Sequence, residues 1–215
     1  MRLVILGLWF CQQLFASSIE FTGTPITTIT AGNLNVPIYK EALVKVGDST
    51  TAQKVYLTGA GVYRKKIVFI EEDVYVAASY LDTPTGITTA DPLQSIFPTK
   101  LRVMYLTILR DLTPSQIRGH FEDGLDANSV DLNDPPVQRL LNQVNFNLVS
   151  GNTNLIIGTV DGPNQTLFIR VPTKEFTSTS PVHSDDFWRI WFGVPFDDEM
   201  GFLRQALIGK KWGDE

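Results

Sequence analysis

Cysteine is almost absent from this sequence, since Cys11 is the only one in 215 residues. One thiol cannot form an intramolecular disulfide, so the folded chain has to be held together by its core. Histidine is nearly as scarce, with only His120 and His183, and this scarcity argues against a transition-metal site. Gly59-Ala60-Gly61 alone does not make a phosphate-binding loop. We therefore expect no metal and no cofactor.

An excess of positive charge is also lacking. The chain has 18 lysine and arginine residues against 23 aspartate and glutamate residues, for a formal net charge of −5. This balance argues against the basic surface with which proteins neutralise nucleic-acid phosphates, so we expect no nucleic-acid partner. Hydrophobic residues make up 43% of the chain and charged residues 19%, a composition that supports a buried core and argues against disorder.

Long apolar runs are confined to the N-terminus. A short positive start, Met1-Arg2, precedes the apolar run 3–10, and the small residues Ala16-Ser17-Ser18 follow. This three-part layout is typical of a secretory signal peptide, and the apolar run is shorter than the about 20 residues that a membrane span needs. We predict a signal peptide at 1–18, cleaved after Ala16 or Ser18.

Two other interpretations of this N-terminal segment stay open. The segment can be a buried first strand or helix, or Cys11 can carry a lipid, although bulky Phe10 stands where lipid attachment prefers a small residue. With a signal peptide, the mature protein is a single domain over 19–215, and it is periplasmic or secreted. We expect no stable membrane span in this domain, because it has no second long apolar run.

The mature chain shows the patterns of both strands and helices. Segments rich in β-branched and apolar residues predict strands at 19–22, 36–46, 54–58, 62–70, 74–81, 101–109, 155–160 and 166–171. Capping residues and prolines predict helices at 92–96, 114–127, 135–148, 184–192 and from 197 onward. This order of elements predicts an α+β protein with a large, mostly antiparallel sheet and helices on one face.

Three local patterns make sharper predictions. Thr113-Pro114-Ser115-Gln116 has the residues of a capping box, in which the side chains of the first and last residue each bond the other's backbone N–H. Gly59-Ala60-Gly61 predicts a turn or a bulge, and Glu71-Glu72-Asp73 predicts an exposed turn. His183-Ser184-Asp185 contains the residue types of a hydrolytic triad, but adjacent residues cannot adopt its geometry. We interpret this last segment as a helix cap.

One cluster of polar residues is a candidate for ligand binding. Tyr63, Arg64 and Lys65-Lys66 follow the glycines, and Tyr75 lies on the next predicted strand. A pleated pair of strands can aim an arginine and one or two tyrosines at the concave face of the sheet, and a guanidinium suits a carboxylate or a phenolate. The alternative is a basic strand edge that faces solvent, with the tyrosine rings packed against neighbours.

Several segments, taken in order, resemble the chalcone isomerase-like superfamily and in particular its bacterial branch, many of whose members carry signal peptides. These segments extend over 19–209 and are Gly59-Ala60-Gly61-Val62, 74–81, 110–113, 122–125, 187–193 and 207–209. The resemblance implies an open-faced sandwich, in which an elongated apolar cleft lies between a large antiparallel sheet and a layer of helices. Plant members of the superfamily cyclise chalcones, whereas other members are non-catalytic and bind fatty acids in the cleft.

The sequence departs from the catalytic members at the positions of their site. The resemblance places Tyr63 at the catalytic arginine, Tyr75 at a threonine, Ile117 at a helix tyrosine and Gly124 at a helix asparagine. A one-residue bulge restores an arginine, Arg64, because a slip of one residue exchanges the two faces of a strand. The nearby glycines favour such a bulge, so we favour Arg64 facing the cleft. Each donor missing from the helix lowers a reaction rate on the order of 10²-fold.

We therefore expect a non-catalytic or weakly catalytic protein that binds a small amphipathic ligand, such as a fatty acid or a similar carboxylate. The residues expected to contact this ligand are Arg64, Tyr63 and Tyr75 at the head group and Ile117, Phe121 and Met104 at the tail. The alternative is an isomerase, an intramolecular lyase of the chalcone isomerase type, that acts on an unknown substrate with Arg64 as its catalytic residue. A third interpretation is a scaffold protein with a filled core.

Overall fold

The computed structural model describes residues 17–67, 70–87, 90–180 and 183–209. The predicted signal peptide therefore lies outside the described residues as far as position 16. The strands are β1 (Ser18–Thr22), β2 (Thr27–Ala31), β3 (Leu34–Ile38), β4 (Glu41–Lys45), β5 (Gln53–Ile67), β6 (Ile70–Leu81), β7 (Leu101–Ile108), β8 (Thr153–Asp161), β9 (Asn164–Val171) and β10 (Lys174–Ser180). The helices are α1 (Pro92–Ile96), α2 (Pro114–Ala127), α3 (Pro135–Leu141), α4 (His183–Phe192) and α5 (Asp198–Leu207).

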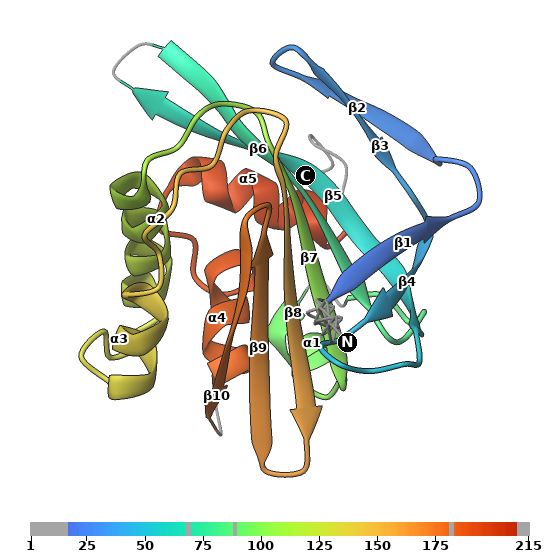
Figure 1. The fold of residues 1–215 in the computed structure, drawn as a ribbon. Helices are drawn as coiled ribbons and strands as arrows, with labels where there is room; N and C mark the ends of the chain where they lie inside the picture. The colour runs from blue at the N-terminus through green and yellow to red at the C-terminus, as the bar shows by residue number, and fades with distance from the viewer. Residues whose placement is uncertain (1–16, 68–69, 88–89, 181–182, 210–215) are drawn as a thin grey trace, which may run out of the picture.

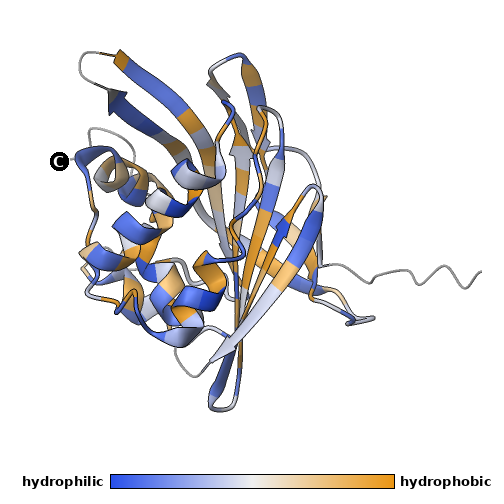
Figure 2. Cartoon of the chain, turned by 60° about the vertical axis from the view of Figure 1, so that its left-hand side comes forward, coloured by the Kyte–Doolittle hydropathy of each residue, from blue (hydrophilic) through white to orange (hydrophobic). Residues whose placement is uncertain are grey.

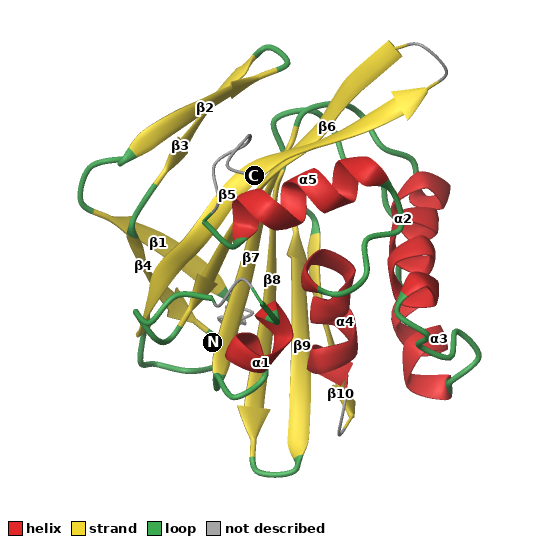
Figure 3. Ribbon diagram, turned by 180° about the vertical axis from the view of Figure 1, so that it is seen from behind, coloured by secondary structure: helices red, strands yellow, loops and turns green. Residues whose placement is uncertain are grey.

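The strands form one large antiparallel sheet and a separate hairpin. The sheet has eight strands in the order β1-β4-β5-β6-β7-β8-β9-β10, and β2 pairs only with β3. The helices lie together on one face of this sheet (Figure 3), so the predicted α+β fold and its open-faced sandwich architecture are confirmed. Among the described residues, no helix combines the length and the apolar character that crossing a bilayer requires.

The large sheet is buried on both faces because its central strands are apolar at nearly every position. On β7, Met104, Leu106 and Ile108 pack into the core under the helices, whereas Leu101 and Val103 pack into a second core on the opposite face. Figure 2 shows the sheet edge-on, with the helices on one side and the N-terminal strands on the other. This alternation places every second side chain of β7 under the helices, where a ligand can lie.

Curling of the sheet encloses the second core. The ring of Phe21, on β1, lies 5.0 Å from the ring of Tyr105 on β7 and 4.8 Å from that of Tyr39, measured between centroids. In the strand order, β4, β5 and β6 separate β1 from β7. Such a contact requires β1 to fold back over the face of the sheet that the helices leave open (Figure 1).

Most of the predicted elements are present, with three corrections. The predicted strand 36–46 is divided between β3 and β4, and the predicted helix 135–148 ends as α3 at Leu141. The predicted turn at Glu71-Glu72-Asp73 is wrong, because these residues lie within β6 and pair with Lys66, Lys65 and Arg64 of β5. Each acidic residue of β6 lies opposite a basic residue of β5, and such pairs of opposite charge favour the strand pairing.

The glycines of Gly59-Ala60-Gly61 lie in the middle of β5 rather than in a turn. A register shift occurs between Leu57 and Gly59, so the bulge that these glycines predict is present. A Cβ on Gly59 would lie 2.1 Å from the carbonyl oxygen of Ala206, and one on Gly61 would lie 2.6 Å from the Cβ of Ala206. The glycines are needed because helix α5 packs directly onto the backbone of β5.

Candidate functional site

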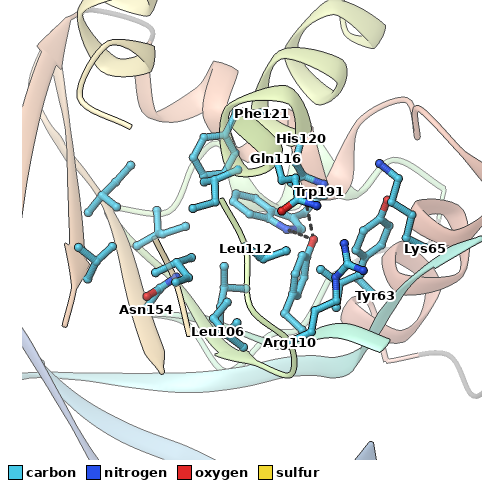
Figure 4. A pocket seen from close by; sticks show the side chains of 18 of the residues that line it. Tyr63, Lys65, Leu106, Arg110, Leu112, Gln116, His120, Phe121, Asn154 and Trp191 are labelled. Atoms are coloured by element: carbon cyan, nitrogen blue, oxygen red, sulfur yellow. Dashed lines mark hydrogen bonds between the residues drawn. The ribbon is translucent and has the colours of Figure 1, made fainter. Parts of the chain in front are cut away.

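A pocket of about 310 Å³ lies between the sheet and helix α2 (Figure 4). This volume is at the lower end of the about 300–1,000 Å³ that is usual for small-molecule sites. Its apolar lining consists of Val74, Leu106, Ile108, Leu112, Ile117, Phe121, Phe146, Leu148, Ile156, Ile169, Val171 and Phe196. Its polar or amphipathic lining consists of Tyr63, Lys65, Tyr75, Arg110, Gln116, His120, Asp123, Asn154 and Trp191.

Strand and helix periodicity explain how these side chains reach the pocket. Leu106 and Ile108 on β7 are two residues apart, and therefore point to the same face of the sheet. On α2, Ile117, His120 and Phe121 follow the spacing of three and four residues that places side chains on one face of a helix. The pocket is thus formed where the apolar face of α2 stands over the sheet.

A cluster of aromatic rings occupies one end of the pocket. The rings of Tyr63 and Tyr75 stack with centroids 5.1 Å apart, and the ring of His120 lies 5.0 Å and 5.6 Å from them. The hydroxyl of Tyr75 lies 3.0 Å from Nε2 of His120, and Nε1 of Trp191 donates to the same hydroxyl at 3.3 Å. Because Tyr75 accepts from Trp191, its own proton is available to His120.

Hydrogen bonding and burial keep both tyrosines in the phenol form. The hydroxyl of Tyr63 donates to Oδ2 of Asp197 at 2.8 Å. The other oxygen of Asp197 accepts from the N–H of Met200 at 2.6 Å and so caps α5. Burial raises the pKa of Tyr63, and the Asp197 carboxylate raises it further. Burial also raises the pKa of Tyr75. Neither hydroxyl is therefore ionised at neutral pH.

His120 is a neutral imidazole at physiological pH. Burial lowers the pKa of His120 from 6.5 to about 3, and the nearby charge of Lys65 adds to this effect. The residue as a whole is partly exposed, but its ring is surrounded by Tyr63, Tyr75 and Phe196. We attribute the lowered pKa to this aromatic enclosure, because desolvation disfavours the imidazolium ion.

Two cations lie at the same end of the pocket as the aromatic cluster. Arg110 follows β7 and forms an ion pair with Glu72, while its Nε is buried without a hydrogen-bond partner. Lys65 has no carboxylate within ion-pair distance among the residues that the structure describes. The lining contains one carboxylate, that of Asp123 on α2, so its cations outnumber its anions. Figure 4 shows Lys65 and Arg110 on the side of Tyr63, away from Asn154.

Four of the six residues predicted to contact a ligand line the pocket, namely Tyr63, Tyr75, Ile117 and Phe121. Arg64 is not part of the lining, because a register shift follows Tyr63, and Nε of Arg64 instead donates to Oδ1 of Asp73 at 2.8 Å. Met104 is also outside the lining and is completely buried in the core under the helices. The structure therefore gives no support to Arg64 as the inward-facing cation.

The predicted ligand contacts did not include Lys65, Arg110, His120 and Trp191, which also line the pocket. Lys65 was part of the predicted cluster, and its spacing of two from Tyr63 is the signal that both share a face of β5. His120 has a similar signal, because it follows Ile117 by three residues on the capped helix. Arg110 and Trp191 carry no such signal, since only tertiary packing brings them to this pocket.

The position at which the family resemblance expects a helix asparagine has no room for one. Gly124 lies on the face of α2 that packs against α4, where an added Cβ would be 2.8 Å from Cγ2 of Ile190. Ile117, at the position of the expected tyrosine, lines the pocket with an aliphatic side chain. The two helix donors of the catalytic members therefore have no counterpart at these positions.

Neither protein-family models nor curated proteins gave a match when the chain was compared with them. In the described part of the chain, no three histidine, cysteine, aspartate or glutamate side chains converge as metal ligands would. The chemistry that the site offers is therefore that of an apolar cavity with cations and a neutral Tyr–His pair at one end.

Proposed function

We propose that the protein binds a small amphipathic carboxylate, such as a fatty acid, in the pocket between the sheet and α2. The observation that carries this proposal is the polarity of the pocket, which is apolar over most of its lining and has Lys65 and Arg110 at one end. A carboxylate head group is complementary to the cations, and a hydrocarbon tail is complementary to the apolar part.

The apolar lining supplies most of the expected affinity. Leu106, Ile108 and Ile156 form part of the floor on the sheet, and Ile117 and Phe121 face them from α2. Burial of each methylene group of a ligand contributes about 0.8 kcal/mol, which corresponds to about fourfold in affinity. We expect affinity to rise by this factor along a series of saturated fatty acids and to stop rising once the tail fills the pocket.

The two cations are better candidates for the head group than the tyrosines. The hydroxyl proton of Tyr63 is already donated to Asp197, and that of Tyr75 is available to His120. Lys65 and the free Nε of Arg110 have donors left for a ligand. A buried donor without a partner is unfavourable, and a ligand or water that accepts from it removes the penalty.

A competition assay tests the proposal. Dodecanoate and uncharged dodecanol are each added to displace a fluorescent fatty acid, and the displacement measures their affinity. We expect Lys65→Ala to weaken dodecanoate binding about tenfold, since a hydrogen bond to a charged group contributes about 1.5–3 kcal/mol and solvent at this exposed position reduces it. Dodecanol should bind more weakly than dodecanoate, and its affinity should be nearly the same in the two proteins.

Lys66→Ala is the matched control. Lys66 carries the same charge one residue further along β5, is exposed, and is not part of the pocket lining. Its replacement removes the same net charge but should leave dodecanoate binding unchanged within about twofold. A protein that binds no dodecanoate, or two variants that lose affinity equally, would contradict the proposal.

A second candidate function is an isomerase that moves a proton on an unknown substrate. The hydrogen-bonded pair of Tyr75 and His120 in the lining favours it, because the pair places a proton donor and a proton acceptor in the pocket. The lowered pKa of His120 makes this imidazole a weak base and argues for slow turnover. The absence of donors at Ile117 and Gly124 argues against efficient chalcone cyclisation. A spectrophotometric chalcone assay tests this candidate: turnover that is lost in His120→Gln supports the isomerase, and no turnover argues against a chalcone substrate.

We also propose that the chain is a member of the chalcone isomerase-like superfamily and that it is exported. The family resemblance implies an antiparallel sheet with helices on one face and an apolar pocket between them. The structure has this architecture, which supports the proposed membership of the superfamily. The proposed export rests on the N-terminal sequence pattern. Recovery of the protein from the periplasm or the medium, rather than from the cytoplasm, is the expected result of cell fractionation.

A further inference from the structure

Ser17 is the residue before β1, and the fold fully encloses it. Its backbone N–H donates to Oε2 of Glu175 at 2.7 Å, and its carbonyl oxygen accepts from Nη1 of Arg170 at 2.6 Å. Its hydroxyl donates to Oε1 of Glu175 at 3.3 Å and accepts from the N–H of Gly47 at 2.9 Å. Every polar group of Ser17 therefore has a partner in the folded protein.

Two of these partner residues, Glu175 and Arg170, come from the opposite edge of the sheet. Glu175 on β10 and Arg170 on β9 are neighbours across the last strand pair, whereas β1 is the first strand in the sheet order. The curl of the sheet brings the start of β1 to them (Figure 1). Ser17 thus links the two edges of the sheet, and a chain that lacked it would lose this link.

The carboxylate of Glu175 accepts hydrogen bonds from Ser17 and has no countercharge within the described part of the chain. Both of its oxygens accept from Ser17, and no lysine, arginine or histidine lies within ion-pair distance among the described residues. Arg170 lies opposite Glu175 in the strand pair but contacts the carbonyl of Ser17 instead. A partly buried carboxylate that faces a backbone nitrogen is suited to an ammonium ion at that nitrogen.

We propose that the exported chain is cleaved between Ala16 and Ser17, and that Glu175 binds the new α-ammonium group of Ser17. Hydrolysis adds one water molecule across the peptide bond. Ala16 leaves with a carboxylate, and Ser17 keeps the amine, which takes up a proton at neutral pH. This proposal is independent of the ligand in the pocket.

The structure distinguishes between the two cleavage sites that the sequence allows. Cleavage after Ser18 would place Ala16 and Ser18 at the two positions where signal peptidases prefer small residues. It would also remove Ser17, with its four hydrogen bonds, and the pairing of Ser18 with Lys45 at the start of β1. Cleavage after Ala16 keeps all of these contacts and still has a small residue before the cleaved bond.

The N-terminus of the exported protein tests the cleavage site. The full chain is produced with its own leader in a bacterium, and the product is analysed by intact mass and N-terminal sequencing. We expect the sequence to begin at Ser17. A product that begins at Ile19, or one that keeps Met1, would overturn the proposal.

A charge substitution tests the second half of the proposal. Glu175→Gln keeps one of the two hydrogen-bond acceptors and removes the charge, and Glu20→Gln removes an exposed carboxylate from β1 as a control. We expect only Glu175→Gln to lower the melting temperature at neutral pH. The difference from the native protein should disappear as the pH rises through about 8 toward 10, where an α-amino group loses its proton while Arg170 stays charged. Equal melting temperatures at neutral pH, or a difference that does not change with pH, would contradict binding of the ammonium group.

Discussion

His120 links the stability of the protein to pH through a single ring. Its pKa is lowered from 6.5 to about 3 in the folded state, so below pH 6.5 the unfolded chain binds a proton that the folded protein does not. The contribution of the neutral His120 ring to the stability of the fold is therefore fully present above pH 6.5 and is lost as the pH falls toward about 3. One such proton reduces the free energy of unfolding by at most about 1.4 kcal/mol per pH unit, and partial exposure of the residue makes the slope smaller.

His120→Gln removes this titration and keeps a hydrogen-bond acceptor for Tyr75. Urea denaturation at several pH values between 7 and 4 should show a shallower loss of stability in this variant than in the native protein. Burial raises the pKa of Asp186, but Asp186 is common to both proteins, so its effect cancels in the comparison. Parallel curves for the two proteins would mean that His120 is not held neutral by the fold.

At the scale of single residues, the sequence predicted the kind of group at the site but not which cation faces inward. Tyr63 and Tyr75 were predicted and line the pocket. Arg64 was favoured over its neighbours, but the register shift after Tyr63 turns it toward Asp73 and leaves Lys65 in the lining. The position of a bulge is set by packing across strands rather than by local sequence, so the choice between these cations needed the structure.

At the scale of elements, the two glycines of β5 determine how closely α5 approaches the sheet. We expect Gly59→Ala to destabilise the protein by about 1–3 kcal/mol, the usual effect of overpacking, because the added Cβ would meet the backbone oxygen of Ala206 at 2.1 Å. Helix α5 would have to move as a unit, since a backbone atom cannot change rotamer. Urea denaturation measures the change in the free energy of unfolding.

Gly119→Ala is the matched control on α2. An added Cβ there meets no atom within 4 Å, and alanine in a helix interior is about 0.5–1 kcal/mol more favourable than glycine. We therefore expect this variant to be more stable than the native protein. The same substitution at the two positions should have effects of opposite sign, and a similar loss at both would argue against a specific contact between α5 and β5.

Elements with their own local signals were predictable, and elements defined by tertiary partners were less so. The capping box at Thr113 and Gln116 is formed with both of its hydrogen bonds, and α2 starts at Pro114 as predicted. Helix α3, in contrast, ends at Leu141, and Leu148 pairs with Leu112 in an isolated bridge beside the pocket. Val144, Phe146 and Leu148 alternate with polar residues, a spacing typical of an extended segment rather than a helix, so the prediction of helix up to 148 overlooked this local signal.

At the scale of the whole molecule, the layers follow from the sequence but the pocket does not. Alternating segments predict a sheet with two buried faces, and amphipathic helices predict a layer over one of them. The pocket is lined from five strands, two helices and the loops between them, and its volume depends on how far α2 stands from β7. No single segment of the sequence determines that distance. The family resemblance therefore implied a cleft, but the sequence could not specify which residues line it.

Attachment of the helical layer to the sheet depends on a buried ion pair. Arg102 of β7 has no exposed surface, and its Nη1 donates to Oδ1 of Asp185 on α4 at 2.5 Å. Its Nη2 donates to the carbonyl of Phe97, which follows α1, at 2.7 Å. The guanidinium on β7 thus bonds to residues of two helical segments, and within the described residues Asp185 is the one carboxylate within ion-pair distance of it.

We expect Asp185→Ala to lower the free energy of unfolding by about 3–5 kcal/mol, because it leaves the guanidinium of Arg102 charged, buried and without its carboxylate. Glu41→Ala is the control, since Glu41 pairs with Lys54 at the surface, where the two side chains are 30% and 47% exposed; its loss should be at most about 1 kcal/mol. Urea denaturation compares the two variants. If both lose the same small amount, Arg102 reaches water or another anion in solution, and this ion pair does not hold the helical layer to the sheet.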